Sequence, residues 1–196
     1  MPSVHRTLIR IAAAGAALAP CAAIASPHSD AVETAVFDIC PALHDGRISA
    51  ERPGALTRRG YRRTPEVEED WADAEDGAPF VFARGQGDET VTIAFWPYPR
   101  LCSVGFGGDD AASAVARVKT RIARERRLYR RVPEAAWTME GIRHEAWRVE
   151  RRVPMCLAID TPDGEDAPLR YEVSYEPLPP LHPGMVRSAC APAAAP

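Results

Sequence analysis

Five cysteines, at positions 21, 40, 102, 156 and 190, constrain this chain more than any other feature. In an oxidising compartment, widely spaced cysteines form disulfides, whereas inside the cell they are thiols, metal ligands or catalytic groups. The N-terminal sequence indicates the compartment, because secretory signals are read there. The compartment to which the chain is exported therefore decides whether disulfides can stabilise its fold.

Residues 1–25 have the order of a secretory signal peptide. Arg6 and Arg10 precede an uncharged, alanine-rich stretch that ends at Ala25 and is too short to cross a bilayer of about 30 Å as a helix. Ala23 and Ala25 supply the small residues of an A-x-A cleavage site. We therefore predict a mature bacterial protein that begins at the next residue and is periplasmic or secreted.

The alternative is a protein that is lipid-anchored in the cell envelope through an acylated Cys21. Leu18 stands three residues before this cysteine, as in a lipoprotein processing site. Pro20 directly precedes the cysteine, where Gly or Ala is expected. We favour simple cleavage, which would remove Cys21 with the leader.

Four cysteines remain in the predicted mature chain, an even number typical of a disulfide framework. Three pairings are possible and the sequence does not choose among them. We favour Cys40 with Cys102 and Cys156 with Cys190, which would fix the first helix to the sheet and hold the tail. No C-x-x-C spacing suggests a metal site, and we expect neither a metal nor a cofactor.

Composition predicts a single domain over residues 26–176, a stretch long enough to bury a core. Seven carboxylates crowd residues 66–76 and predict an acidic mobile loop over 66–78. Residues 177–196, rich in Pro and Ala, are expected to be a loose tail pinned by Cys190. The net charge of −3 becomes more negative without the leader, which argues against nucleic acid as a partner.

Hydrophobic periodicity predicts the secondary structure. Asp30 and Glu33 resemble a capping box for a helix over 31–43, and Pro53 opens a shorter helix that ends near Gly60. Asp109 is the expected N-cap of one long amphipathic helix. Strands are expected over 79–84, 91–96, 101–106, 137–139, 144–150, 154–160 and 169–176. This order predicts an α+β fold in which antiparallel β meanders of about six to seven strands pack with the long amphipathic helix and an N-terminal helix.

No catalytic residue is predicted. Ser103 lies in "LCSVG", which lacks the first glycine of a G-x-S-x-G elbow. The histidines are isolated from one another in the sequence, and we expect them to be surface or turn residues: His28, His44, His144 and His182. The turn "GFGGDD" at 105–110 resembles a phosphate cradle, but Asp109 and Asp110 would repel a phosphate there.

The most distinctive surface feature is the arginine-rich face of the long helix. We predict that its binding residues are Arg117, Arg121, Arg124 and Arg127. Arginines of the following strands widen this face if those strands lie beside the helix: Arg143, Arg148, Arg151 and Arg152. A solvated helix face is the alternative. The candidate partners are an acidic envelope protein, a phosphate-bearing envelope polymer, or the acidic loop of the same molecule.

Three stretches resemble small exported proteins of unknown function from GC-rich Gram-negative bacteria: "FDIC" at 37–40, "RRGYRR" at 58–63 and "RLCSVGF" at 100–106. The resemblance implies no activity. We therefore predict a non-catalytic binding or envelope-accessory domain with no transmembrane segment in the mature chain. The rival is a small cell-envelope hydrolase or transferase whose polar groups converge only in space. A flat arginine-lined face favours binding, and a deep pocket joining a histidine to a carboxylate or serine favours the enzyme. The sequence does not predict the oligomeric state.

Overall fold

A computed structural model describes most of the predicted mature chain, over residues 26–65, 78–98, 100–164, 170–178 and 190. The predicted signal peptide lies outside the described residues. So do most of the predicted acidic loop and most of the predicted tail. The fold described below is built from the remaining segments.

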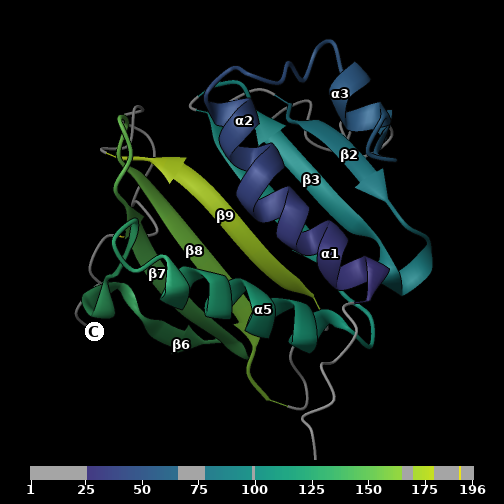
Figure 1. Ribbon diagram of the computed structural model, residues 1–196. Coiled ribbons are helices and arrows are strands. Elements are labelled where there is room, and N and C mark those ends of the chain that lie inside the picture. Colours follow the sequence, from purple (N-terminus) through teal and green to yellow (C-terminus); the bar gives the residue numbers. More distant parts are fainter. Residues whose placement is uncertain (1–25, 66–77, 99, 165–169, 179–189, 191–196) are drawn as a thin grey trace, which may run out of the picture.

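A single antiparallel sheet of nine strands forms the body of the protein (Figure 1). The strand order is β1-β2-β3-β4-β9-β8-β7-β5, and β6 pairs with β7 at the same outer edge as β5. The strands are β1 Arg62–Arg63, β2 Phe80–Arg84, β3 Val91–Trp96, β4 Leu101–Phe106, β5 Tyr129–Arg131, β6 Trp137–Met139, β7 Ile142–Val149, β8 Met155–Pro162 and β9 Tyr171–Pro177.

The α+β class and the antiparallel meanders are confirmed, but the prediction of six to seven strands was too low. The strands that were missed are β1 and β5, which are two and three residues long. They are rich in arginine and show no apolar alternation from which a strand could be predicted. Backbone pairing with the longer strands β2 and β7 holds them in the sheet.

The chain runs through the same order of elements twice. A helix followed by the meander β2-β3-β4 comes first, and a helix followed by β7-β8-β9 comes second. The last strands of the two meanders, β4 and β9, pair with each other at the centre of the sheet. The two helices therefore lie on the same side of one continuous sheet (Figure 1).

The N-terminal helical segment begins earlier than predicted. It consists of α1 Pro27–Thr34, a π-helical turn over Ala35–Ile39, and α2 Cys40–His44. Its N-cap is Ser26, whose hydroxyl accepts a hydrogen bond of 3.1 Å from the backbone N–H of Ser29. The predicted capping box of Asp30 and Glu33 is therefore wrong, because both residues lie inside the helix.

The other helical elements are α3 Gly54–Thr57, α5 Ala111–Arg124 and two short 3-10 turns, η2 Gly87–Glu89 and η3 Pro133–Ala135. The N-cap of α5 is Asp110, one residue later than predicted, and its side chain makes no capping hydrogen bond. The helix α5 contacts α1 directly, and both helices lie on the same side of the sheet (Figure 1).

Alternation along the strands directs one apolar face of the sheet toward these helices. The core contains residues of β3, β4, β9, β8 and β7 together with the buried stripes of α1 and α5: Val91, Ile93, Phe95, Val104, Phe106, Val173, Tyr175, Leu157, Ile159, Trp147, Val149, Val32, Val36, Val115, Val118 and Ile122. A smaller cluster of Ala135, Ala146 and Cys156 is separate from this core. Cys156 lies between Met155 and Leu157, which face the helices, so its side chain points to the opposite face.

The structure contains the disulfides Cys40–Cys102 and Cys156–Cys190, which is the pairing favoured above. The first joins α2 to β4 within the main core. The second attaches Cys190 to the opposite face of β8. One disulfide therefore stabilises the contact of helix and sheet, and the other holds a C-terminal residue against the outer side.

Removing the first disulfide should strongly destabilise the protein. In a Cys40→Ala/Cys102→Ala variant we expect the free energy of unfolding to fall by about 2–5 kcal/mol, because the bridge closes a long loop in the unfolded chain. Urea denaturation followed by circular dichroism measures this change. An unfolding midpoint equal to that of the oxidised wild type would contradict the expected role of this bridge.

Candidate functional site

The four arginines that the sequence predicted as a binding face do not share one environment. The buried stripe of α5 contains Val115, Val118 and Ile122, so its arginines lie on the flanks and at the end of the helix. Arg117 and Arg121 lie on the flank that faces α1. Arg124 is the last residue of α5, and Arg127 follows it in the turn that leads to β5. The four residues therefore form two pairs with different contacts.

Arg117 and Arg121 are used within the protein. Arg117 lies 2.9 Å from Asp30 Oδ1 and 2.6 Å from Glu33 Oε2, and Arg121 lies 3.4 Å from Glu33 Oε1. Arg121 also pairs with Glu125 at 3.1 Å and lies 4.3 Å from the centre of the Phe37 ring. These contacts connect α5 to α1 and to the π-helical turn. We call Arg117, Arg121, Asp30 and Glu33 the helix clamp.

The electrostatics of the helix clamp favour the charged arginines. Partial burial disfavours the charged form of Arg117, but its hydrogen bonds to Glu33 and Asp30 outweigh this and raise its pKa. Arg121 is also partly desolvated, and Glu125 is the main group that raises its pKa. Arg117 and Arg121 therefore remain charged, and both are occupied by contacts within the protein.

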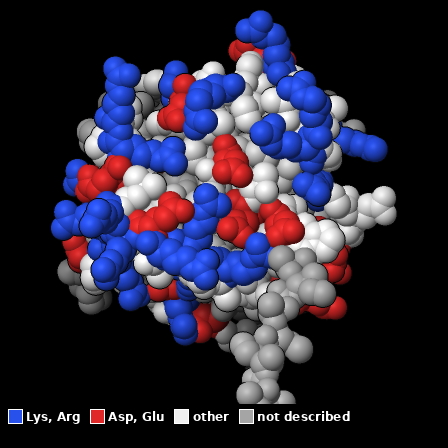
Figure 2. Space-filling model, in the orientation of Figure 1, with Lys and Arg blue, Asp and Glu red and all other residues white. Residues whose placement is uncertain are grey.

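Arg124 and Arg127 have the opposite character. Both are exposed, as are Arg126 and Arg130, and none of these four has an ion-pair partner among the described residues. At the same edge of the sheet, Arg148 of β7 lies opposite Arg130 of β5. Both side chains leave the face of the sheet away from α5, because their neighbours Tyr129 and Val149 belong to the core beneath the helices. We call Arg124, Arg126, Arg127, Arg130 and Arg148 the basic edge. Figure 2 shows Lys and Arg gathered along α5 and at its left-hand end.

Sequence reasoning located part of the basic edge. Arg148 lies on β7, the strand that pairs with β5, but its neighbours Trp147 and Val149 face the core beneath the helices, so the Arg148 side chain leaves the other face of the sheet and does not widen the arginine face of α5. The register of Arg130 with Arg148 was missed, because β5 is a three-residue strand with no recognisable pattern. Another basic residue of α5, Lys119, pairs with Glu145, which also binds Arg131 at 2.8 Å. These two cations therefore share one carboxylate beside the basic edge.

The histidines differ from the prediction. His28, His44 and His144 are buried, with exposed fractions of 7%, 4% and 5%, instead of lying at the surface. Desolvation by burial lowers the pKa of His44. His28 lies in the first turn of α1 and His44 ends α2, whereas His144 lies within β7 and stacks on Trp137. The isolated sequence position of a histidine does not reveal these tertiary contacts. His182 lies outside the described residues.

One histidine contacts a carboxylate. His144 Nδ1 lies 2.6 Å from Asp160 Oδ1, and the His144 ring stacks on Trp137 with ring centres 4.8 Å apart. A cavity of about 320 Å³ beside this pair is lined by Trp137, His144 and Glu145, among others. None of the residues that line the cavity is a serine or a cysteine. The pair can hold the imidazole in one orientation, and Thr138 supplies a hydroxyl among the residues that line the cavity.

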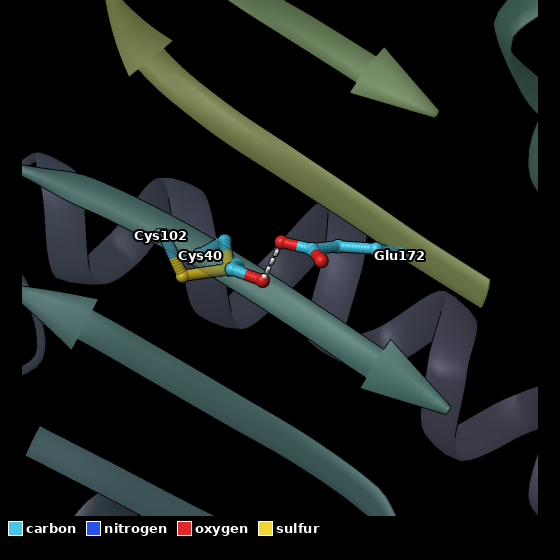
Figure 3. Close-up of a disulfide and its surroundings, with 4 residues drawn as sticks. Cys40, Cys102 and Glu172 are labelled. Atoms are coloured by element: carbon cyan, nitrogen blue, oxygen red, sulfur yellow. Dashed lines mark hydrogen bonds between the residues drawn. A yellow bond between two sulfur atoms is a disulfide. The ribbon is translucent and has the colours of Figure 1, made fainter. Parts of the chain in front are cut away.

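Ser103 lies elsewhere on the sheet. Its hydroxyl donates a hydrogen bond of 2.6 Å to Glu172 Oε1. Ser103 follows Cys102 on β4, so this pair lies on the face of the sheet opposite the disulfide of Cys40 and Cys102, which is drawn with Glu172 in Figure 3. The strands of Ser103 and His144, β4 and β7, are separated by β9 and β8. Three strand spacings amount to roughly 14 Å. Ser103 and His144 are therefore too far apart to act as nucleophile and base.

The glycine turn before α5 lines a cavity of about 780 Å³. Gly108 and Asp109 form one wall, and Asp88, Glu89 and Arg170 also line it. Three carboxylates against one guanidinium make this cavity unfavourable for a phosphate. The turn therefore adds no anion site to the basic edge.

No family model, curated protein or solved structure matches this chain. In the described part of the chain, no helix is long and apolar enough to cross a membrane.

The helix clamp and the basic edge should respond differently to the same substitution. Arg117→Gln should reduce the free energy of unfolding by about 0.5–1.5 kcal/mol, because it leaves Asp30 and Glu33 without their main cation. Arg124→Gln, on the same helix, should change it by less than about 0.5 kcal/mol. Thermal and urea denaturation of both variants test this, and equal effects would show that Arg117 is no more structural than Arg124.

Proposed function

We propose that the chain is an exported, non-catalytic accessory protein of the cell envelope, which binds an acidic envelope protein or polymer through the basic edge. The signal-peptide pattern of residues 1–25 supports export to the periplasm or to the outside of the cell. The two disulfides are compatible with an oxidising compartment. The partner is identified by its negative charge.

The observation that carries this proposal is the group of exposed, unneutralised arginines at one end of α5. Elsewhere on α5 the protein supplies an acidic partner for Arg117, Lys119 and Arg121. Among the described residues, Arg124, Arg126, Arg127 and Arg130 receive none. The contrast lies within one helix and the strand that follows it, so it does not reflect an overall excess of arginine.

The form of the surface also supports binding. Arg124, Arg126 and Arg127 lie at the end of α5 and in the turn that follows it, so an extended anionic partner can contact several of them at once. Exposed charges of this kind act at long range and are screened by salt. They raise the association rate with an acidic partner and make the affinity depend on ionic strength.

One observation favours a second function. The hydrogen bond between His144 and Asp160 adjoins a cavity, and such a pair is a component of acid-base catalysis. A small envelope hydrolase or transferase would need further reacting groups beside that cavity. If a His144→Gln variant lost an activity toward an envelope substrate while keeping its fold, this second function would replace the first.

The position of the chain in the envelope can be tested separately. Intact mass of the protein isolated from its native envelope should correspond to residues 26–196 with two disulfides. A mass that starts at Cys21 and includes acyl chains would instead establish the lipid-anchored form. Either result leaves the binding role of the basic edge to its own test.

Neutralising the end of α5 should weaken binding to an acidic polymer. In an Arg124→Gln/Arg126→Gln/Arg127→Gln variant we expect the affinity for fluorescent poly-L-glutamate to fall about 10- to 100-fold at low salt. This corresponds to about 0.5–1 kcal/mol for each exposed charge that is lost. Fluorescence anisotropy over a series of salt concentrations measures the affinity and its salt dependence.

The matched control is an Arg58→Gln/Arg59→Gln/Arg62→Gln variant. It removes the same charge from three exposed arginines at α3 and β1, on a different part of the surface. We expect its affinity to stay within about threefold of the wild type, because only the local field around the basic edge should matter at short range. Equal losses in the two variants would show that net charge alone drives the binding.

A further inference from the structure

Arg130 and Arg148 form an unusual pair within the basic edge. They are directly opposite each other in the antiparallel pairing of β5 with β7. Side chains at such positions leave the same face of the sheet, with Cβ atoms about 5 Å apart. Like charges at directly opposite positions are destabilising. The strand register therefore places two side chains of like charge at directly opposite positions.

The surroundings compensate this repulsion only in part. A cleft of about 350 Å³ is lined by Arg130, Arg131, Val132, Arg148 and Glu150. Glu150 Oε1 lies 3.3 Å from Arg148 Nε, and the side chain of Arg148 remains 53% exposed. Arg131 pairs with Glu145, which also binds Lys119. Within the described residues, one carboxylate thus serves two guanidinium groups, and Arg130 has no acidic partner.

The backbone fixes this geometry. The N–H of Glu150 donates to the carbonyl of Leu128 at 2.8 Å, and the N–H of Val132 donates to the carbonyl of Ala146 at 2.9 Å. These hydrogen bonds extend the pairing of β5 with β7 at both ends. The Cα atoms of Arg130 and Arg148 are therefore held opposite each other without a bound ligand, which lowers the entropic cost of binding.

We propose that Arg130 and Arg148 together bind a phosphate group. A phosphomonoester carries about −1.5 to −2 charges at pH 7 and three acceptor oxygens, so it can neutralise both guanidinium groups. Each guanidinium presents a fork of N–H donors suited to such oxygens. A single carboxylate carries one charge, and Glu150 already supplies that much. This inference rests on the proposed function and names the chemical group that the basic edge recognises.

Glu150 has an opposing role in this site. Its carboxylate binds the Nε of Arg148 and repels an incoming anion, while the terminal amino groups of Arg148 and the whole guanidinium of Arg130 remain for the ligand. Substitution of Glu150 should therefore strengthen phosphate binding, whereas substitution of either arginine should weaken it. General charge attraction would give the same signs, so a site is distinguished by the larger effect of Arg130→Gln or Arg148→Gln than of an exposed arginine elsewhere on the surface.

The experiment measures binding of inorganic phosphate to the disulfide-bonded mature protein by isothermal titration calorimetry at constant ionic strength. We expect saturable binding that weakens at least tenfold in Arg130→Gln and in Arg148→Gln and strengthens about two- to fivefold in Glu150→Gln. Arg62→Gln is the matched control and should leave the affinity unchanged. Circular dichroism checks that each variant is folded. Equal effects of Arg130→Gln and Arg62→Gln, or no saturable binding to the wild type, would overturn the proposal.

Two further binding experiments identify the source of the phosphate. Glycerol 3-phosphate represents a soluble phosphomonoester, and phosphatidylcholine vesicles with and without phosphatidic acid represent a lipid headgroup. Binding to glycerol 3-phosphate that depends on Arg130 supports a soluble or polymer-borne ester. Binding only to vesicles with phosphatidic acid, again dependent on Arg130, supports a headgroup.

The two proposals fail separately. If poly-L-glutamate binding depends on Arg124, Arg126 and Arg127 but phosphate does not bind the wild type, the phosphate site is wrong and the proposed function stands. If phosphate binding depends on Arg130 and Arg148 but the triple variant binds poly-L-glutamate normally, the site stands. The proposed contact through the end of α5 is then wrong.

Discussion

Burial of one apolar face of the sheet beneath two helices is the constraint on which the rest of this structure depends. Alternating residues of the central strands supply that face, and the stripes of α1 and α5 cover it. A helix stripe and a sheet face are unstable in water until they meet. The disulfide Cys40–Cys102 and the helix clamp hold the helices at this position. The opposite face of the sheet then carries the polar pairs of Ser103 with Glu172 and of His144 with Asp160.

The arginines of α5 acquire their roles from this packing. Where α5 passes α1, Asp30 and Glu33 come within reach and the arginines become structural. Where α5 runs past the end of α1 and turns into β5, Arg124, Arg126 and Arg127 have no ion-pair partner among the described residues and stay exposed. The same residue type in one helix thus stabilises the fold at one end and offers a binding surface at the other.

Particular elements show how far sequence reasoning extends. The strand β4 was predicted with the bounds that the structure has, and β3 contains the predicted alternation of Val91, Ile93 and Phe95, because apolar residues alternate regularly in both strands. Asp30 and Glu33 were assigned to a cap, because the pattern S/T/D-x-x-E is local, whereas their contacts with Arg117 and Arg121 join residues more than 80 positions apart. The short strand β5 was missed because only pairing with β7 makes it a strand.

By itself, the sequence determined the class of fold, the long amphipathic helix and the presence of an arginine-rich face. These follow from periodicity and composition, which act over a few residues. Only the tertiary structure decided which arginines are neutralised and which are not. It also decided that Arg130 lies opposite Arg148, because strand register and helix packing set distances between residues that are far apart in the chain.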